Sequence, residues 1–141
     1  MEITFHFQKA ATLIQRKKLK VFIASIFKSE YKSLSSLSFV FCSDSYLLEI
    51  NKNFLQHNFF TDIITFDLTP KGKKEIEAEI YISIERVKEN AKTFKTSIQQ
   101  ELHRVIFHGV LHLCGYTDKS KLQKEKMTHK EDFYLISYEI I

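Results

Sequence analysis

The segment of this sequence best suited to chemistry is a pair of histidines followed by a glycine and an aspartate. His108 and His112 are four residues apart, so on a helix they share a face, one turn apart. Gly115 can adopt a positive φ and end such a helix, which lets the chain turn back and bring Asp118 toward the same face. Two imidazoles and a carboxylate that leave a fourth position open are typical of catalytic zinc. We therefore predict a metal site at His108, His112 and Asp118.

The residues around the two histidines indicate a buried helix. The stretch is apolar on most faces, as its side chains Val105, Ile106, Phe107, Val110, Leu111 and Leu113 show. Burying two imidazoles there costs free energy unless they have partners, and a metal ion would be one. Asp118 has an alternative role, because an aspartate also suits the N-cap of the lysine-rich helix expected after it. Residue types alone leave both roles open.

The amino-acid composition limits the class of protein to which this chain can belong. The chain has 141 residues, 44% of them hydrophobic, with three glycines and one proline, so we expect one folded domain over residues 1–141. Two cysteines, Cys42 and Cys114, are too few for a disulfide scaffold, and we expect no disulfide partner. No stretch reaches the ~18 apolar residues of a membrane span and no secretory signal is visible, so we expect a cytoplasmic protein. A net charge of +4 is compatible with nucleic acid but does not require it.

The elements that must position the site follow from hydrophobic periodicity and turn signals. Alternation predicts strands near residues 3–7 and 76–82, and a β-branched and aromatic run predicts another at 63–66. Residues 37–42 read as a further strand, and we expect a hairpin between 63–66 and 76–82. Helical spacing predicts helices over residues 9–28, 44–52, 84–94 and 97–114, and a last helix leading to residue 141 with an extended tail as an option. This order predicts an α+β fold in which a small mixed sheet of about four strands packs against helices, with the metal site on a central buried helix.

Five segments together resemble one known family. The stretch from His108 to Asp118 resembles the HGxLHLxGYDH motif of the YbeY family of metal-dependent endoribonucleases. Four further pieces follow the same family in order and spacing: Ile50, Asn51 and Phe54 resemble LNxxY, residues 61–66 resemble TDVLSF, residues 78–83 resemble GDIxIS, and Met127 stands where the family often has methionine. The resemblance covers most of residues 40–131.

The resemblance implies a single-strand-specific endoribonuclease with one zinc ion per chain. Its expected role is the maturation of 16S ribosomal RNA and ribosome quality control, with ribosomal RNA and the small subunit as partners. His108 and His112 match the first two zinc-binding histidines of the family. The third falls on Asp118, which still binds zinc but adds negative charge beside the ion.

Two further differences from the family motifs concern the binding of substrate. The arginine usual after the LNxxY tyrosine falls on Leu55, and the acidic residue of the same segment falls on Asn58. Either activity is reduced in this chain or another cation replaces the arginine. We expect that replacement to be Lys52 or Lys119, as a substrate-binding residue.

Two other functions fit parts of the same pattern. The spacing from His108 to Asp118 also matches the ligands of metzincin metalloproteases, and Met127 could mimic their Met-turn. Those enzymes carry a glutamate beside the first histidine as general base, whereas this chain has Gly109. The other possibility is a non-catalytic factor that binds ribosomal RNA or the ribosome and whose metal is structural. The loss of the family arginine at Leu55 favours this second alternative.

Overall fold

The computed structural model describes residues 1–56 and 60–140. In this part of the chain four strands and five helices form the α+β fold that the sequence predicts. In chain order they are β1 (Glu2–Phe7), α1 (Arg16–Ser29), β2 (Leu34–Cys42), α2 (Asp44–Leu55), β3 (Ile63–Asp67), β4 (Ile76–Ser83), α3 (Ile84–Thr93), α4 (Ile98–Leu113) and α5 (Lys121–Glu139). No helix among them combines the length and apolar character that crossing a bilayer requires.

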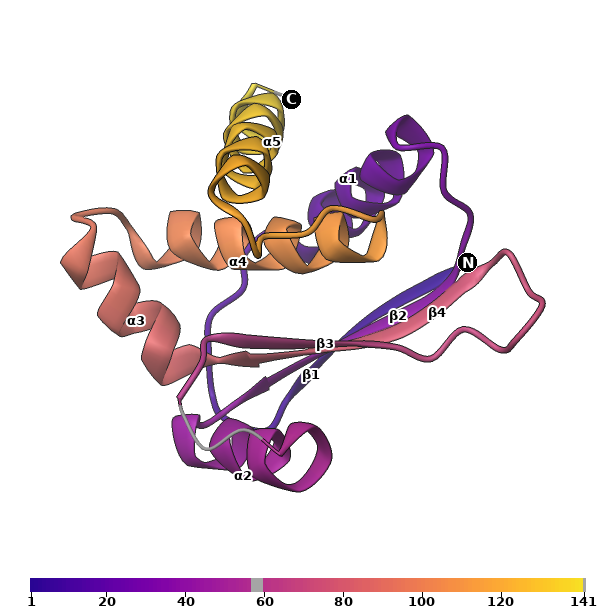
Figure 1. Ribbon diagram of the computed structural model, residues 1–141. Helices are drawn as coiled ribbons and strands as arrows, with labels where there is room; N and C mark the ends of the chain where they lie inside the picture. Colours follow the sequence, from indigo (N-terminus) through magenta and orange to yellow (C-terminus); the bar gives the residue numbers. More distant parts are fainter. Residues whose placement is uncertain (57–59, 141) are drawn as a thin grey trace.

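The sheet is mixed and has the order β1-β2-β4-β3. β1, β2 and β4 are parallel neighbours, whereas β3 runs antiparallel to β4 and stands at one edge. Helices α1, α4 and α5 lie on one face of the sheet and α2 on the other, so the sheet is covered from both sides (Figure 1). The segment that joins β3 to β4 projects beyond the sheet as the predicted hairpin.

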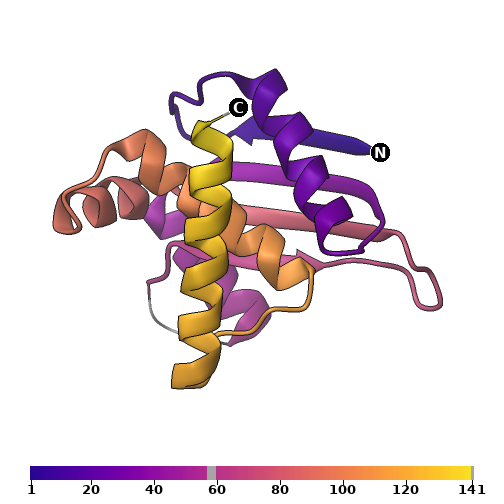
Figure 2. The same cartoon turned by 90° about the horizontal axis from the view of Figure 1, so that it is seen from above.

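Helix α4 is the centre of the molecule. It lies directly over the sheet, and α5 crosses it on its outer side (Figure 2). Ten of its residues are buried: Glu101, Leu102, His103, Val105, Ile106, Phe107, Gly109, Val110, Leu111 and Leu113. The helix begins where the Ser97 hydroxyl accepts the backbone N–H of Gln100, and Gly115 follows its end with φ of 105°. The prediction of a central buried helix with a glycine stop is confirmed.

Gly109 allows α4 to approach the sheet this closely. A Cβ atom added at Gly109 would lie 2.9 Å from Cδ1 of both Ile63 and Ile80, closer than real Cβ atoms come to other heavy atoms. Position 109 therefore faces the sheet and not the cluster formed by His108 and His112. A larger side chain there would have to displace the ends of Ile63 and Ile80, and this chain has no carboxylate at the position of the metzincin general base.

The prediction of one helix over residues 9–28 is wrong at its start. The helix begins at Arg16, after Gln15 in a left-handed conformation with φ of 52°. The preceding segment satisfies its backbone groups elsewhere: two of its amides donate to the Phe41 carbonyl at 2.9 and 3.1 Å, and the Thr12 carbonyl accepts from Gln99 at 2.6 Å. These long-range bonds take the place of helical ones.

The other differences are smaller. β2 begins at Leu34 rather than 37, because its serine-rich start pairs with β4. The last helix ends at Glu139, and residue 141, where an extended tail was an option, lies outside the described residues. Cys42 and Cys114 are both buried and free.

Candidate metal centre

The three predicted ligands converge at the end of α4. The Nε2 atoms of His108 and His112 are 2.9 Å apart, and Oδ2 of Asp118 lies 3.4 Å from the first and 3.5 Å from the second. All three side chains are partly exposed. One ligand atom from each can therefore reach a common ion that is open to solvent on one side, and among the described residues these are the only three that meet this test.

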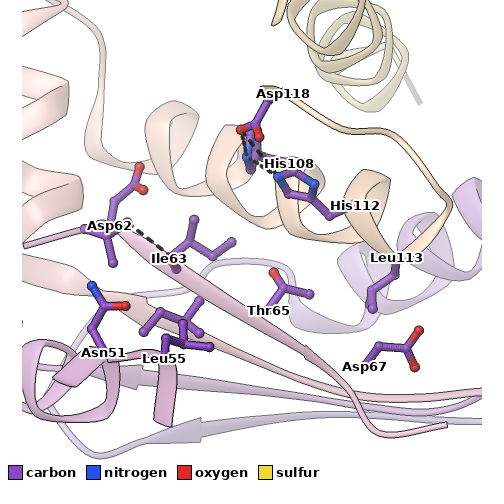
Figure 3. Close-up of a pocket in the computed structure, with 12 residues that line it drawn as sticks. Asn51, Leu55, Asp62, Ile63, Thr65, Asp67, His108, His112, Leu113 and Asp118 are labelled. Atoms are coloured by element: carbon purple, nitrogen blue, oxygen red, sulfur yellow. Dashed lines mark hydrogen bonds and ion pairs between the residues drawn. The ribbon is translucent and has the colours of Figure 1, made fainter. Parts of the chain in front are cut away.

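The N-cap role that Asp118 could have played belongs to Ser120. The Ser120 hydroxyl accepts the backbone N–H of Gln123, whose side chain returns to the N-cap amide, so the two form a complete capping box for α5. Asp118 lies two residues before this cap, in the turn after Gly115. Its carboxylate is left to face the two histidines (Figure 3).

Each imidazole is oriented by a hydrogen bond on its other ring nitrogen. Nδ1 of His108 donates to Oε2 of Glu131 at 2.6 Å, and Nδ1 of His112 donates to the Tyr116 carbonyl at 2.9 Å. In the neutral form of each ring the proton therefore resides on Nδ1, and Nε2 presents a lone pair. Two lone pairs 2.9 Å apart repel unless a cation lies between them. The donor set thus fits a divalent metal ion such as zinc.

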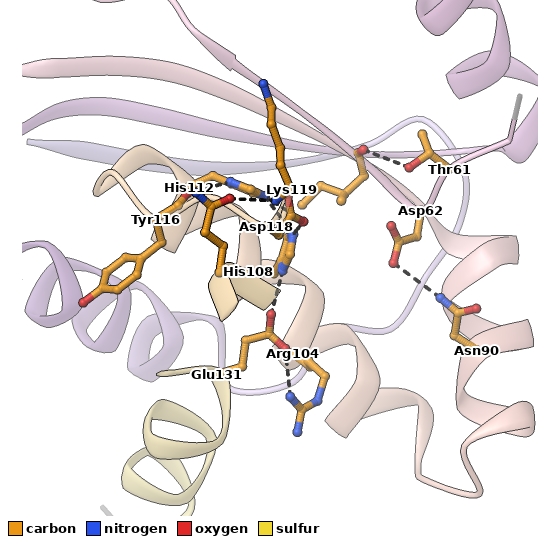
Figure 4. Close-up of polar contacts among 12 residues, drawn as sticks. Thr61, Asp62, Asn90, Arg104, His108, His112, Tyr116, Asp118, Lys119 and Glu131 are labelled. Atoms are coloured by element: carbon orange, nitrogen blue, oxygen red, sulfur yellow. Dashed lines mark hydrogen bonds and ion pairs between the residues drawn. The ribbon is translucent and has the colours of Figure 1, made fainter. Parts of the chain in front are cut away.

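Glu131 links the cluster to α5 and is nearly buried, with its side chain 9% exposed. Its other oxygen accepts from Arg104 at 2.8 Å (Figure 4). Arg104 also contacts Asp132 at 2.5 Å. Burial alone would lower the pKa of His108, but the hydrogen bond and charge of Glu131, with the charge of Asp118, raise it overall. The carboxylate therefore makes the His108 imidazole more basic and fixes its ring, which is how partners of metal-binding histidines act.

Sequence reasoning missed Glu131, Arg104 and the Tyr116 carbonyl. Glu131 did carry a signal, because it is the one acidic residue in the buried stripe of α5 formed by Met127, Glu131, Tyr134, Leu135 and Tyr138. An acid within an apolar stripe needs a buried partner. The Tyr116 carbonyl carried no such signal, since any residue type offers one.

The cluster opens into a cleft of about 510 Å³. Its wall is made by the end of α4, the outer side of β3 and the last turns of α2 (Figure 3). Asn51 and Leu55 line it from α2, and Thr61 and Asp62 line it from the segment before β3. The cluster thus lies in a cleft that α4, β3 and α2 form together.

Asp62 stands between this cleft and a smaller cavity of about 230 Å³ behind His108. Burial raises the pKa of Asp62 against the opposing charge of His108, and burial also raises the pKa of Glu101, which lines the same cavity. The side chain of Asp62 accepts from Asn90 at 3.4 Å. The sequence motif contained Asp62, but its spacing assigned the residue no role.

The predicted substrate-binding lysines lie outside the cleft lining. Lys52 is an exposed residue in the last turn of α2, and Lys119 is an exposed neighbour of Asp118. Their role in binding substrate stays a prediction. Leu55, at the position of the family arginine, is 40% exposed and does line the cleft, while Asn58 lies outside the described residues.

An open cleft with two histidines and a carboxylate at its base, on an α+β frame, is typical of metal-dependent hydrolases. Comparison with known proteins narrows this class. The family model of endoribonuclease YbeY matches residues 4–139, and the chain belongs to this family of RNA-cleaving hydrolases.

Individual relatives agree with this assignment. The chain is 47% identical over 134 residues to an endoribonuclease YbeY of Cytophaga hutchinsonii, with 93% of each chain covered. It is 45% identical over 131 residues to the endoribonuclease YbeY of Flavobacterium psychrophilum, covering 93% of this chain and 88% of the other. A Thermotoga maritima protein solved in solution matches with a TM-score of 0.64 and 26% identity, over 98% of this chain and 89% of that one. The resemblance drawn from the sequence motifs is thereby confirmed.

Proposed function

We propose that this chain is a zinc-dependent endoribonuclease that cuts single-stranded RNA during maturation of 16S ribosomal RNA and in ribosome quality control. Its partners would be ribosomal RNA and the small subunit, and its place the cytoplasm, where ribosomes assemble. The observation that carries the proposal is the convergence of His108, His112 and Asp118 on one point at the base of an open cleft. Family membership supports the RNA substrate.

His108, His112 and Asp118 would hold one zinc ion, whose Lewis acidity would act on the scissile phosphodiester. The chain's own residues prepare this site in two ways. Glu131 and the Tyr116 carbonyl keep the Nδ1 protons in place, so both Nε2 atoms stay available as ligands. The open side of the cluster faces the cleft, so an RNA phosphate can approach it without rearrangement of α4.

The test pairs metal content with cleavage. His112→Ala should abolish stoichiometric zinc, because two remaining ligands rarely hold the ion, and should abolish cleavage of a single-stranded oligoribonucleotide. About one zinc per mutant chain, or undiminished cleavage, would contradict the proposal. Asp118→His should retain zinc, since it restores the family ligand, whereas Asp118→Ala should lose it; zinc retained by Asp118→Ala would show that Asp118 is not a ligand.

The same samples separate the remaining alternatives. A native protein that cleaves no RNA, with ribosome association unchanged by His112→Ala, would instead indicate a non-catalytic factor. Analysis of the product ends then identifies the nucleophile, because attack by the RNA 2′-hydroxyl leaves a 2′,3′-cyclic phosphate and attack by water does not.

A further inference from the structure

The cleft lacks the groups that usually hold RNA. Among the described residues that line it there is no lysine or arginine, whereas three aspartates do line it: Asp62, Asp67 and Asp118. Phosphate contacts normally come from cations. If RNA is the substrate, as the proposed function requires, neutral groups must position the strand beside the metal site.

The outer edge of β3 offers such neutral groups. β3 is the last strand of the sheet, and within residues 1–56 and 60–140 no strand pairs with its other side. In an antiparallel pair, alternate residues direct both backbone groups to the partner strand and the residues between direct them away. Ser83 donates to the Asp62 carbonyl at 2.9 Å and Leu68 donates to the Glu77 carbonyl at 2.7 Å. The even-numbered residues 62 to 68 therefore face β4.

It follows that Ile63, Thr65 and Asp67 direct their N–H and C=O groups away from the sheet. All three line the cleft that contains His108 and His112, and Figure 3 shows Thr65 on β3 across from the histidine pair. The Ile63 carbonyl already accepts from the Thr61 hydroxyl at 3.3 Å. Thr65 is thus the central residue of this open edge, with one donor and one acceptor facing the cleft.

We propose that the open edge of β3 binds the base edges of an unpaired RNA segment, with the N–H and C=O of Thr65 as the central contacts. Base edges carry matching donors and acceptors, and in a duplex these are already paired. Successive outward-facing residues lie about 6.8 Å apart, at a rise of about 3.4 Å per residue, whereas stacked bases lie about 3.4 Å apart. The strand must therefore be unpaired and extended, which deepens the proposed function by explaining a preference for single strands.

The test removes one backbone N–H and leaves the sheet intact. Thr65→Pro deletes an N–H that does not bond to β4, and proline is tolerated at such edge positions. Thr65→Ala is the matched control, because it removes the same side chain but keeps the N–H. We expect Thr65→Pro to bind a single-stranded oligoribonucleotide about tenfold more weakly than Thr65→Ala, the usual effect of one lost neutral hydrogen bond.

A second ligand identifies what the edge contacts. An abasic oligonucleotide of equal length keeps every sugar and phosphate, so Thr65→Pro and Thr65→Ala should bind it equally. If the two variants bound normal RNA with equal affinity, the proposal would be overturned, and an extended peptide would become the better candidate for binding along this edge. An equal loss for normal and abasic RNA would overturn it as well, because the contact would then not involve bases.

Two controls keep the result interpretable. Circular dichroism and zinc content report whether Thr65→Pro folds, and if it does not, an α-hydroxy acid incorporated at position 65 replaces the N–H by an oxygen with the side chain retained. Binding is measured on the native chain and on His112→Ala, which should not cleave. The ratio of affinities thus tests the edge even if the native chain shows no nuclease activity, a result that would refute the proposed function alone.

Discussion

Glu131→Gln tests whether the cluster on α4 depends on its buried partner on α5. The substitution keeps the volume of the side chain and an oxygen that can accept from Nδ1 of His108, but it removes the negative charge. That charge lies 2.6 Å from the imidazole, on a side chain only 9% exposed, so solvent screens it little. The His108 ring should become less basic and less firmly held.

The expected magnitude is a 10- to 100-fold loss of zinc affinity, the range found when hydrogen-bond partners of metal-binding histidines are removed. This corresponds to about 1.4–2.7 kcal/mol of binding free energy. The loss should shrink in acid, because Glu131 also raises the pKa of His108 and protons compete with the metal for the same imidazole. Near neutral pH the imidazole of the native protein is better placed and a stronger ligand.

The assay is competition for zinc with a chelator of known affinity, and Asp132→Asn is the matched control. Asp132 contacts Arg104 at 2.5 Å but does not contact His108, so its substitution should leave zinc affinity nearly unchanged. If Glu131→Gln bound zinc as tightly as the native chain, the hydrogen bond to His108 would not tune the site. If both variants lost affinity equally, the effect would come from Arg104 and not from the imidazole partner.

Three further predictions concern two residues of α4 and one residue that lines the cleft. Gly109→Ala should lower the free energy of unfolding by about 1 kcal/mol in urea titrations, since overpacking of about 1–3 kcal/mol outweighs the gain of about 1 kcal/mol in helix propensity; unchanged stability would mean that Ile63 and Ile80 move aside. Burial, and secondarily the charge of Lys18, lowers the pKa of His103 from 6.5 to about 4. Between about pH 6.5 and about pH 4 the unfolded chain therefore binds a proton at His103 that the native chain does not. The free energy of unfolding falls as the pH drops through this range, and His103→Phe should remove up to about 3 kcal/mol of that fall. The same pH dependence of unfolding for the native chain and for His103→Phe would refute this. Leu55→Arg should steepen the salt dependence of RNA binding by about 0.7 in logarithmic slope, and an unchanged slope would place position 55 away from the phosphates.

The convergence of His108, His112 and Asp118 could be predicted because the rules that place these residues are local. Two histidines four residues apart share a helix face whatever surrounds the helix, and a glycine after the helix end turns the chain over three residues. The fold class followed in the same way from strand and helix periodicity. These inferences needed no knowledge of which element packs against which.

What could not be predicted depends on packing between distant elements. Glu131 reaches His108 only because α5 crosses α4, a contact between residues 23 positions apart. The start of α1 was misplaced for a similar reason, since bonds from the preceding segment to Phe41 and Gln99 replaced helical ones. The open edge of β3 likewise follows from strand order, which periodicity does not give.

The electrostatic character of the cleft connects these observations. Asp118 in place of a third imidazole and Leu55 in place of an arginine each make the surroundings of the metal site less positive, and no described lining residue is a lysine or arginine. RNA affinity should then divide into two parts, a salt-dependent part from lysines outside the cleft and a salt-independent part from the edge of β3. Hydrogen bonds to bases release no counterions, so raising salt should weaken binding by Thr65→Pro and Thr65→Ala equally and leave their affinity ratio constant. A ratio that falls toward one as salt rises would mean that the N–H of Thr65 acts on phosphate, and the edge would then be part of the electrostatic contact and not a reader of unpaired bases.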